Sequence, residues 1–335
     1  MWRAASMPLT GEPQQLDERM TLNTVQTMKD FLPDDGCAGT LLARVWNPNG
    51  PFPGPMVVAV RAAGLFDVTE KWPTVADVLD EPNPAAALND MGGTFVATVG
   101  EALANSALPA SDSVLRFLAP VDVQVIKACG VTFADSMLER VIEERTKGDA
   151  SGAGAVRAEI TAVIGDNLQG LKPGSAPAMA LKEVLKAKGW WSAYLEVGIG
   201  PDAEVFTKAP VMGAVGPGAL VGIRSDSSWN NPEPEVVLAV NARGETVGVS
   251  LGNDVNLRDI EGRSALLLGK AKDNNASCAI GPFIRLFDAT FGMDDVRQMT
   301  LDLQVAGDDG YALQGENQMS RISRDPLDLV AQTIS

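Results

Sequence analysis

Three acidic residues stand at the open end of a predicted β-hairpin. Glu233 and Glu235 lie at the start of one apolar run, Asp254 follows a second, and the turn ARGE (242–245) joins the two runs. Carboxylates this close repel one another unless a cation neutralises them, and ligands that are all oxygen suit Mg²⁺, Mn²⁺ or Ca²⁺. The spacing alone is compatible with two interpretations, a metal site or a strand face exposed to solvent. The prolines that flank Glu233 favour the exposed strand.

The pairing register of this hairpin decides whether the carboxylates meet. With Arg243 and Gly244 at the centre of the turn, the directly opposed pairs on one face are all apolar: Val240 and Val247, Leu238 and Val249, Val236 and Leu251. A slip of one residue would mix apolar and polar side chains, so the pattern supports this register. Glu233 then lies opposite Asp254, and Glu235 shares its face because strand side chains alternate.

The absence of histidine excludes several common catalytic arrangements. The 335-residue sequence contains no histidine, so it has no Ser-His-Asp or Cys-His nucleophile, no His-ligated zinc and no histidine base. The three cysteines, Cys37, Cys129 and Cys278, are scattered without a CxxC pair, which fits neither a disulfide scaffold nor a zinc site. The chemistry must therefore use carboxylates, lysine or an oxygen-ligated metal.

The charge and hydropathy of the chain bear on its partners. The formal net charge is −16 and the sequence has no basic patch, so we expect no binding to nucleic acid or to an anionic membrane. No apolar run approaches the length of a membrane span, and the opening MWRAASMPLTGEPQQ has no apolar signal core. We therefore expect a cytoplasmic protein that binds neither nucleic acid nor a membrane.

The predicted elements give an α+β fold in two parts. Strands over 40–48 and 55–69, with short helices near 74–80 and 98–105, form a small N-terminal β-rich module. The polar segment LPASDS separates this module, residues 1–113, from residues 114–335.

The second part begins with helices and continues with strands. Helical patterns over 133–148, 155–168 and 176–189 form the connection, with DASGAGA (149–155) as a loop. The predicted strands of the β-rich region follow: 194–200, 203–210, 219–227, 233–241, 245–253, 278–287 and 301–307.

Several separated motifs carry a family resemblance. They are Glu233-Pro-Glu235, Asn253-Asp254, and Lys272 followed by Gly281-Pro282. From about Leu118 onward the sequence resembles the fumarylacetoacetate hydrolase family. Within that family it is most similar to the dehydratases of 2-keto-3-deoxy-D-pentonates (2-keto-3-deoxy-D-xylonate or 2-dehydro-3-deoxy-D-arabinonate). The resemblance implies a catalytic domain built as a mixed β-sandwich roll, and a homodimer or a tetramer.

The resemblance also implies roles for single residues. Glu233, Glu235 and Asp254 match metal ligands, with Mg²⁺ expected and Mn²⁺ or Ca²⁺ as alternatives. Glu204 matches a catalytic carboxylate, and Lys272 matches a lysine that contacts the substrate.

Four further residues match segments that line the pocket of the family and are expected to bind substrate: Lys208, Arg224, Ser225 and Asp226. Taken singly, Lys208 also fits an exposed lysine at a strand end. Arg224 and Asp226 fit a structural ion pair equally well. Cys278 is expected to be a packed small residue, because nothing basic is placed to activate its thiol.

The resemblance implies a hydro-lyase that converts 2-keto-3-deoxy-D-pentonate to 2,5-dioxopentanoate in non-phosphorylative pentose catabolism. Loss of a C3 proton and of the C4 hydroxyl would use Glu204 and Lys272 as base and acid, in an order that sequence does not assign. Tautomerisation of the unsaturated product of this elimination would then give 2,5-dioxopentanoate. The alternative chemistry is C–C hydrolysis of a 2,4-diketo acid. Hydrolases of the family often activate water with a His-Glu pair, so the absence of histidine favours elimination.

A third interpretation is a non-catalytic protein that binds a 2-keto acid. Family members continue for some tens of residues beyond a segment like ISRDPLDLV, and that continuation includes a threonine-bearing segment that closes the pocket. This sequence ends at Ser335. We therefore expect the C-terminus to be incomplete.

Overall fold

The structure is a computed structural model that describes residues 31–49, 52–107, 111–133, 154, 158, 171–307 and 309–334. The chain forms two compact units. The first comprises Met1–Lys127, Thr207–Val296 and Leu301–Glu316, and the second comprises Ala128–Phe206, Arg297–Thr300 and Asn317–Ser335. None of the described helices is long and apolar enough to cross a membrane.

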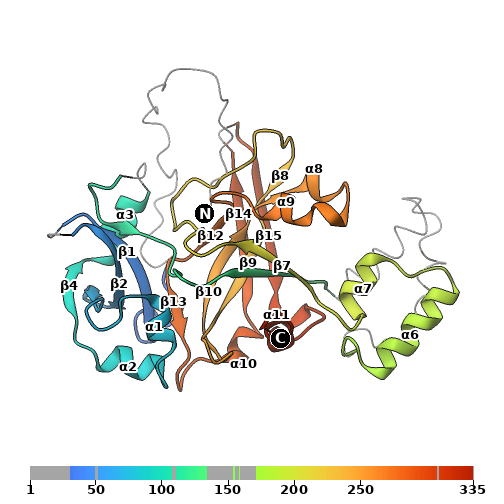
Figure 1. Cartoon of the computed structure of the whole chain (residues 1–335), viewed down its shortest axis with the longest axis horizontal. Coiled ribbons are helices and arrows are strands. Elements are labelled where there is room, and N and C mark those ends of the chain that lie inside the picture. Colours follow the sequence, from blue (N-terminus) through green and yellow to red (C-terminus); the bar gives the residue numbers. More distant parts are fainter. Residues whose placement is uncertain are drawn as a thin grey trace. The chain divides into compact units, whose positions relative to one another are not determined.

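The first unit is built on one antiparallel sheet (Figure 1), whose principal strand order is β12-β10-β13-β1-β2-β3-β4. β5 pairs with β1, and β9 pairs with β10. The strands are β1 (Leu41–Asn47), β2 (Gly54–Arg61), β3 (Gly64–Asp67), β4 (Thr94–Ala97), β5 (Arg116–Phe117), β9 (Pro234–Val240), β10 (Thr246–Asp254), β12 (Cys278–Ile280) and β13 (Ile284–Leu286). The N-terminal strands thus share a sheet with the β9–β10 hairpin, at whose open end the three acidic residues lie.

Helices cover both faces of β1, which explains why most of its residues are apolar. Neighbouring residues of a strand point to opposite faces. Leu42 packs with α1 (Val75–Leu79) and α2 (Pro84–Asp90), whereas Leu41 packs with α3 (Val99–Ser106). A strand buried on both faces needs apolar residues at nearly every position.

The hairpin of β9 and β10 has the predicted register over most of its length. Leu238 pairs with Val249, and Val236 with Leu251. Near the turn the prediction is wrong, because Val240 pairs with Thr246 and a bulge follows. The reason is a turn longer than two residues, closed by a hydrogen bond from Asn241 N to Glu245 O (3.0 Å), with Gly244 at φ +78.

Shorter elements of the first unit frame the open end of this hairpin. They are β8 (Asn230–Asn231), β11 (Asn256–Leu257), α8 (Arg258–Glu261), the 3₁₀ turn η3 (Ala265–Leu267) and α9 (Leu268–Lys272). β8 pairs with β11, and Leu257, Ile260 and Ala271 form a small core below them. Further along the chain lie α10 (Met293–Val296) and the two-stranded pair β14 (Thr300–Ala306) and β15 (Ala312–Gln318).

The described part of the second unit is mainly helical. It contains α6 (Ala176–Ala187), α7 (Ala193–Ile199), the 3₁₀ turn η4 (Met319–Arg321) and α11 (Pro326–Ile334). β6 (Ile126–Gly130) and β7 (Glu204–Ala209) form a two-stranded sheet whose strands run from one unit into the other.

The predicted α+β class is confirmed, and several elements are corrected. The segment 55–69 forms two strands, because the chain turns at 62–63 before Gly64 (φ +134). The predicted strand 194–200 is the helix α7, whose first turn is capped by the Ser192 hydroxyl and whose apolar residues Leu195 and Ile199 are buried one turn apart. The predicted strand 219–227 has no ladder partner among the described residues.

Other predictions have mixed outcomes. The helix over 176–189 is confirmed as α6, whereas the helices over 133–148 and 155–168 and the loop 149–155 lie almost wholly outside the described residues. The run 278–287 is two strands, β12 and β13, because Gly281 and Pro282 interrupt it and proline offers no N–H to a ladder. The domain boundary at residue 113 and the sandwich-roll description stay predictions.

Candidate metal centre

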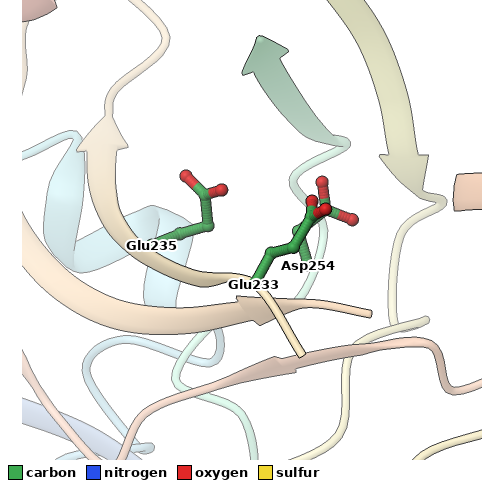
Figure 2. Close-up of side chains that lie close together, drawn as sticks. All are labelled: Glu233, Glu235 and Asp254. Carbon is green, nitrogen blue, oxygen red and sulfur yellow. The ribbon is translucent and has the colours of Figure 1, made fainter. Parts of the chain in front are cut away.

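The open end of the β9–β10 hairpin brings three carboxylates together. One oxygen each of Glu233, Glu235 and Asp254 lies within 4.8 Å of the others. Figure 2 shows all three side chains rising from the same side of the strands. Asp254 ends β10, and its N–H donates to the Glu233 carbonyl (2.9 Å), so main-chain pairing fixes the predicted opposition of these two residues.

Amide side chains hold Glu233 in place. Its N–H donates to Asn253 Oδ1 (3.0 Å), and its carboxylate accepts from Asn256 Nδ2 (3.0 Å). Asn256 is fully buried, and the same nitrogen donates to Glu261 Oε2 (2.8 Å) on α8. A ligand held by such second contacts needs little reorganisation when it binds a cation.

Two buried lysines balance the negative charge of the cluster. Lys272 is 3% exposed and donates both to Glu233 and to Asp254 Oδ2 (3.0 Å). Lys208 is 1% exposed, and its Nζ lies 2.8 Å from Asp254 Oδ1. The interpretation of Lys208 as an exposed strand-end lysine is therefore wrong.

Glu235 is the carboxylate with the most perturbed protonation. Burial, together with the neighbouring charges of Asp254 and Glu233, raises its pKa to about 8, although the charges of Lys272 and Lys208 oppose the shift. The carboxyl group therefore holds a proton at neutral pH until a cation or another positive group replaces it. This behaviour fits a ligand whose charge is matched by a bound metal.

The residues present fit a hard divalent cation. The donor set is entirely oxygen, the carboxylates converge, and Asp254 Oδ1 is buried without an aligned hydrogen bond from any described residue. Its 2.8 Å contact with Lys208 Nζ is an ion pair and not an aligned hydrogen bond. Mg²⁺ characteristically uses a few such carboxylates and keeps other positions for water or substrate.

The predicted substrate residues Arg224, Ser225 and Asp226 lie in an exposed loop. Arg224 Nε and Nη2 donate to the two oxygens of Asp226 (2.9 and 2.8 Å), so the predicted ion pair is present. The pairing lowers the pKa of Asp226 and raises the pKa of Arg224. Ser225 is exposed. The substrate role of these residues stays a prediction.

Glu204 is the first residue of β7 and belongs to the second unit. Its side chain lies over Gly130, where a Cβ would come within 2.0 Å of Glu204 Oε2. Glycine at this position thus leaves room for the carboxylate. The catalytic role of Glu204 stays a prediction.

Three supporting residues were not singled out by sequence reasoning: Asn256, Glu261 and Ser277. Asn256 follows Asp254 by two residues, which is the one signal that could have indicated it. The Ser277 hydroxyl accepts from Lys208 Nζ (3.3 Å) and lies 2.9 Å from the Lys272 carbonyl oxygen, and no local sequence pattern indicates these contacts. Cys278, paired with Asp254 across β12 and β10, is a buried thiol whose pKa burial raises to about 12, in agreement with the predicted packing role.

Two known proteins with similar sequences agree with the predicted resemblance to pentonate dehydratases. No family model matches the chain. Over 91 residues it is 44% identical to a probable 2-keto-3-deoxyxylonate dehydratase of Haloferax volcanii, covering 27% of this chain and 31% of that protein. Over 81 residues it is 38% identical to a 2-dehydro-3-deoxy-D-arabinonate dehydratase of Saccharolobus solfataricus, covering 24% and 27%. The matches thus span less than a third of these relatives.

Solved structures share the fold over most of the chain. The apo form of a 2-keto-3-deoxy-D-arabinonate dehydratase superimposes with a TM-score of 0.59 at 18% identity, covering 88% of this chain and 82% of that one. A 2-keto-3-deoxy-D-arabinonate dehydratase complexed with magnesium and 2,5-dioxopentanoate gives 0.58 at 17% identity, covering 87% and 80%. The sequence matches to the two curated dehydratases confirm the predicted resemblance, and the solved structures show that the fold is shared.

Proposed function

We propose that this chain is a magnesium-dependent hydro-lyase that converts 2-keto-3-deoxy-D-pentonate to 2,5-dioxopentanoate. The observation that carries the proposal is the convergence of Glu233, Glu235 and Asp254, with the Lys272 ammonium in contact with two of them. The names of the relatives and the ligands of the solved neighbour support the substrate class. Cytoplasmic placement and assembly as a homodimer or tetramer belong to the same proposal.

Glu233, Glu235 and Asp254 would hold the cation. A bound divalent cation acts as a Lewis acid that draws electrons from the carboxylate and C2 carbonyl of a 2-keto acid and so makes its C3 protons more acidic.

The charges of the chain's own residues suit such a substrate. With Glu235 ionised, three carboxylates face the charges of Lys208 and Lys272. A divalent cation then leaves the site with one positive charge, which matches the single carboxylate of a keto acid. The site therefore attracts this anion although the chain as a whole is acidic.

Lys272 supplies the proton-transfer chemistry near the cluster. Its ammonium is held by Glu233 and Asp254, and these carboxylates raise its pKa although burial opposes the shift. An ammonium in this position donates hydrogen bonds to a developing enolate or to the departing C4 hydroxyl. Glu204 would act as its acid or base partner, and elimination of water requires no histidine-activated nucleophile.

The test uses purified protein with 2-keto-3-deoxy-D-pentonate and, separately, a 2,4-diketo acid. Each substrate is incubated with Mg²⁺ or with excess EDTA. We expect 2,5-dioxopentanoate from the first substrate only, with the activity lost in EDTA. Cleavage of the diketo acid alone would replace the proposal by a C–C hydrolase. Binding of both keto acids without turnover would support a non-catalytic binding protein.

The variant Glu235→Gln tests the metal site directly. A neutral amide oxygen replaces a charged ligand of almost the same shape, so turnover should disappear while the fold is retained. Full activity in this variant, with an unchanged circular dichroism spectrum, would refute the site.

A further inference from the structure

The ammonium group of Lys208 is enclosed by protein acceptors. Its Nζ lies 2.8 Å from Asp254 Oδ1 and donates to the carbonyl oxygen of Val255 (2.8 Å). It also donates to the carbonyl oxygen of Lys272 and to the Ser277 hydroxyl (3.3 Å). A lysine ammonium has three donors. The hydrogen bonds to Val255, Lys272 and Ser277 use all three, and Asp254 Oδ1 is held as an ion pair. A side chain that is 1% exposed offers nothing to a substrate.

These contacts join Lys208 on β7 to segments that lie far along the chain from it. Asp254 ends β10, Lys272 ends α9, and Ser277 immediately precedes β12. Ser277 extends the connection, because its hydroxyl also lies within hydrogen-bond distance (2.9 Å) of the Lys272 carbonyl. A buried ammonium is costly unless its acceptors are all in place. The four contacts therefore hold the Asp254 carboxylate and the main chain of Lys272 in one arrangement.

We propose that Lys208 is a positioning residue, and not a substrate ligand: it orients Asp254 for the divalent cation and fixes the place of Lys272. The inference rests on the proposed metal-dependent function and adds a role that substrate recognition does not require. It predicts that loss of Lys208 changes which cations the site accepts.

The two possible roles of Lys208, orienting Asp254 or only adding a positive charge, have different effects on the affinities for Mg²⁺ and Ca²⁺. Mg²⁺ demands nearly ideal octahedral geometry, whereas Ca²⁺ tolerates irregular and flexible coordination. If Lys208 orients Asp254, its loss weakens Mg²⁺ binding much more than Ca²⁺ binding. If Lys208 acts only as a positive charge, its loss changes both affinities by the same factor, because both ions carry the same charge.

Three variants separate these possibilities. Lys208→Met keeps the length of the side chain and removes the ammonium. Ser277→Ala removes one of its acceptors and spares the charge. Lys127→Met is the matched control, because Lys127 also donates to β7, at Thr207 Oγ1 (3.0 Å), but is exposed.

The measurement is isothermal titration of the full chain with Mg²⁺ and with Ca²⁺, without substrate. Lys208→Met should weaken Mg²⁺ binding by about tenfold to a hundredfold and Ca²⁺ binding by less than about threefold. Ser277→Ala should shift the ratio of the two affinities in the same direction by a smaller factor, and Lys127→Met should leave it unchanged.

Each outcome decides the question. Equal changes for the two ions, or no change, would overturn the positioning role of Lys208. If circular dichroism shows that Lys208→Met does not fold, an unshifted ratio in Ser277→Ala would overturn it instead. Failure of the unaltered chain to bind Mg²⁺ would overturn the proposed metal site itself, and the inference with it.

Discussion

Uptake of Mg²⁺ at neutral pH should release a proton from Glu235. Burial and the charges of Asp254 and Glu233 raise the pKa of Glu235 to about 8. A protonated carboxyl is a poor metal ligand, so the proton must leave when the cation binds. Lys272 is not the source, because its pKa is raised from an already high value and it stays protonated at neutral pH.

The size of the release follows from the pKa of about 8. At pH 7 about 0.9 of the Glu235 side chains carry the proton, and at pH 9 about 0.1 do. Mg²⁺ binding should therefore release about 0.9 proton at pH 7 and about 0.1 at pH 9. The apparent affinity should rise with pH, by up to about tenfold per pH unit below pH 8, and level off above it.

The assay is titration calorimetry in pairs of buffers that have the same pH but different ionisation enthalpies. The difference in measured heat gives the number of protons released. In Glu235→Gln, which keeps the shape of the side chain and removes the titrating group, the weaker Mg²⁺ binding that remains should release no proton. Binding without proton release at pH 7 would refute the assignment of Glu235 as a buried, protonated ligand. So would a release that persists in Glu235→Gln.

The same shift has a consequence for stability in EDTA. The folded pKa of Glu235 lies above its ordinary value of 4.5, so the folded state keeps a proton that the unfolded chain has lost. The free energy of unfolding should therefore fall as pH rises from about 4.5 to about 8, by up to about 1.4 kcal/mol per pH unit. Urea unfolding at several pH values measures this slope. With saturating Mg²⁺ the free energy of unfolding should instead rise with pH, because the cation binds the ionised carboxylate.

Three further substitutions have clear expected effects. Asn256→Ala removes the amide that joins Glu233 to Glu261, and should weaken Mg²⁺ binding by about tenfold in calorimetry without altering the fold. Lys272→Met should lower turnover of the keto acid by at least about a hundredfold in a product assay while Mg²⁺ still saturates the protein. Arg324→Met removes a guanidinium that is 3% exposed and donates to main-chain carbonyls before β7, and should cost about 3 kcal/mol in urea unfolding.

The β9–β10 hairpin shows how much of the site can be predicted from sequence. Strand alternation and a uniform set of apolar pairs fix the register, and register alone places Glu233 opposite Asp254. The error near Val240 arose because the turn length depends on side-chain contacts: Asn241 Oδ1 accepts from the N–H groups of Arg243 and Glu245, which lengthens the loop. Local patterns therefore predict which residues meet, and less well how the chain turns.

The role of Lys208 shows where sequence reasoning ends. Its acceptors come from positions 47, 64 and 69 residues further along the chain. Nothing in the local sequence distinguishes a lysine enclosed by such contacts from one at a solvated strand end. The helix α7 was missed for a related reason: its apolar spacing over seven residues fits a strand as well as a helix, and the Ser192 cap decides between them.

The position of β1 within the sheet limits how the chain can be shortened. β1 lies between β2 and β13, and β13 in turn pairs with β10, the strand that ends at Asp254. A fragment that begins at the predicted boundary would leave β13 as an open edge, and unpaired edges recruit strands from other molecules. Attempts to express the C-terminal part alone should therefore yield aggregates.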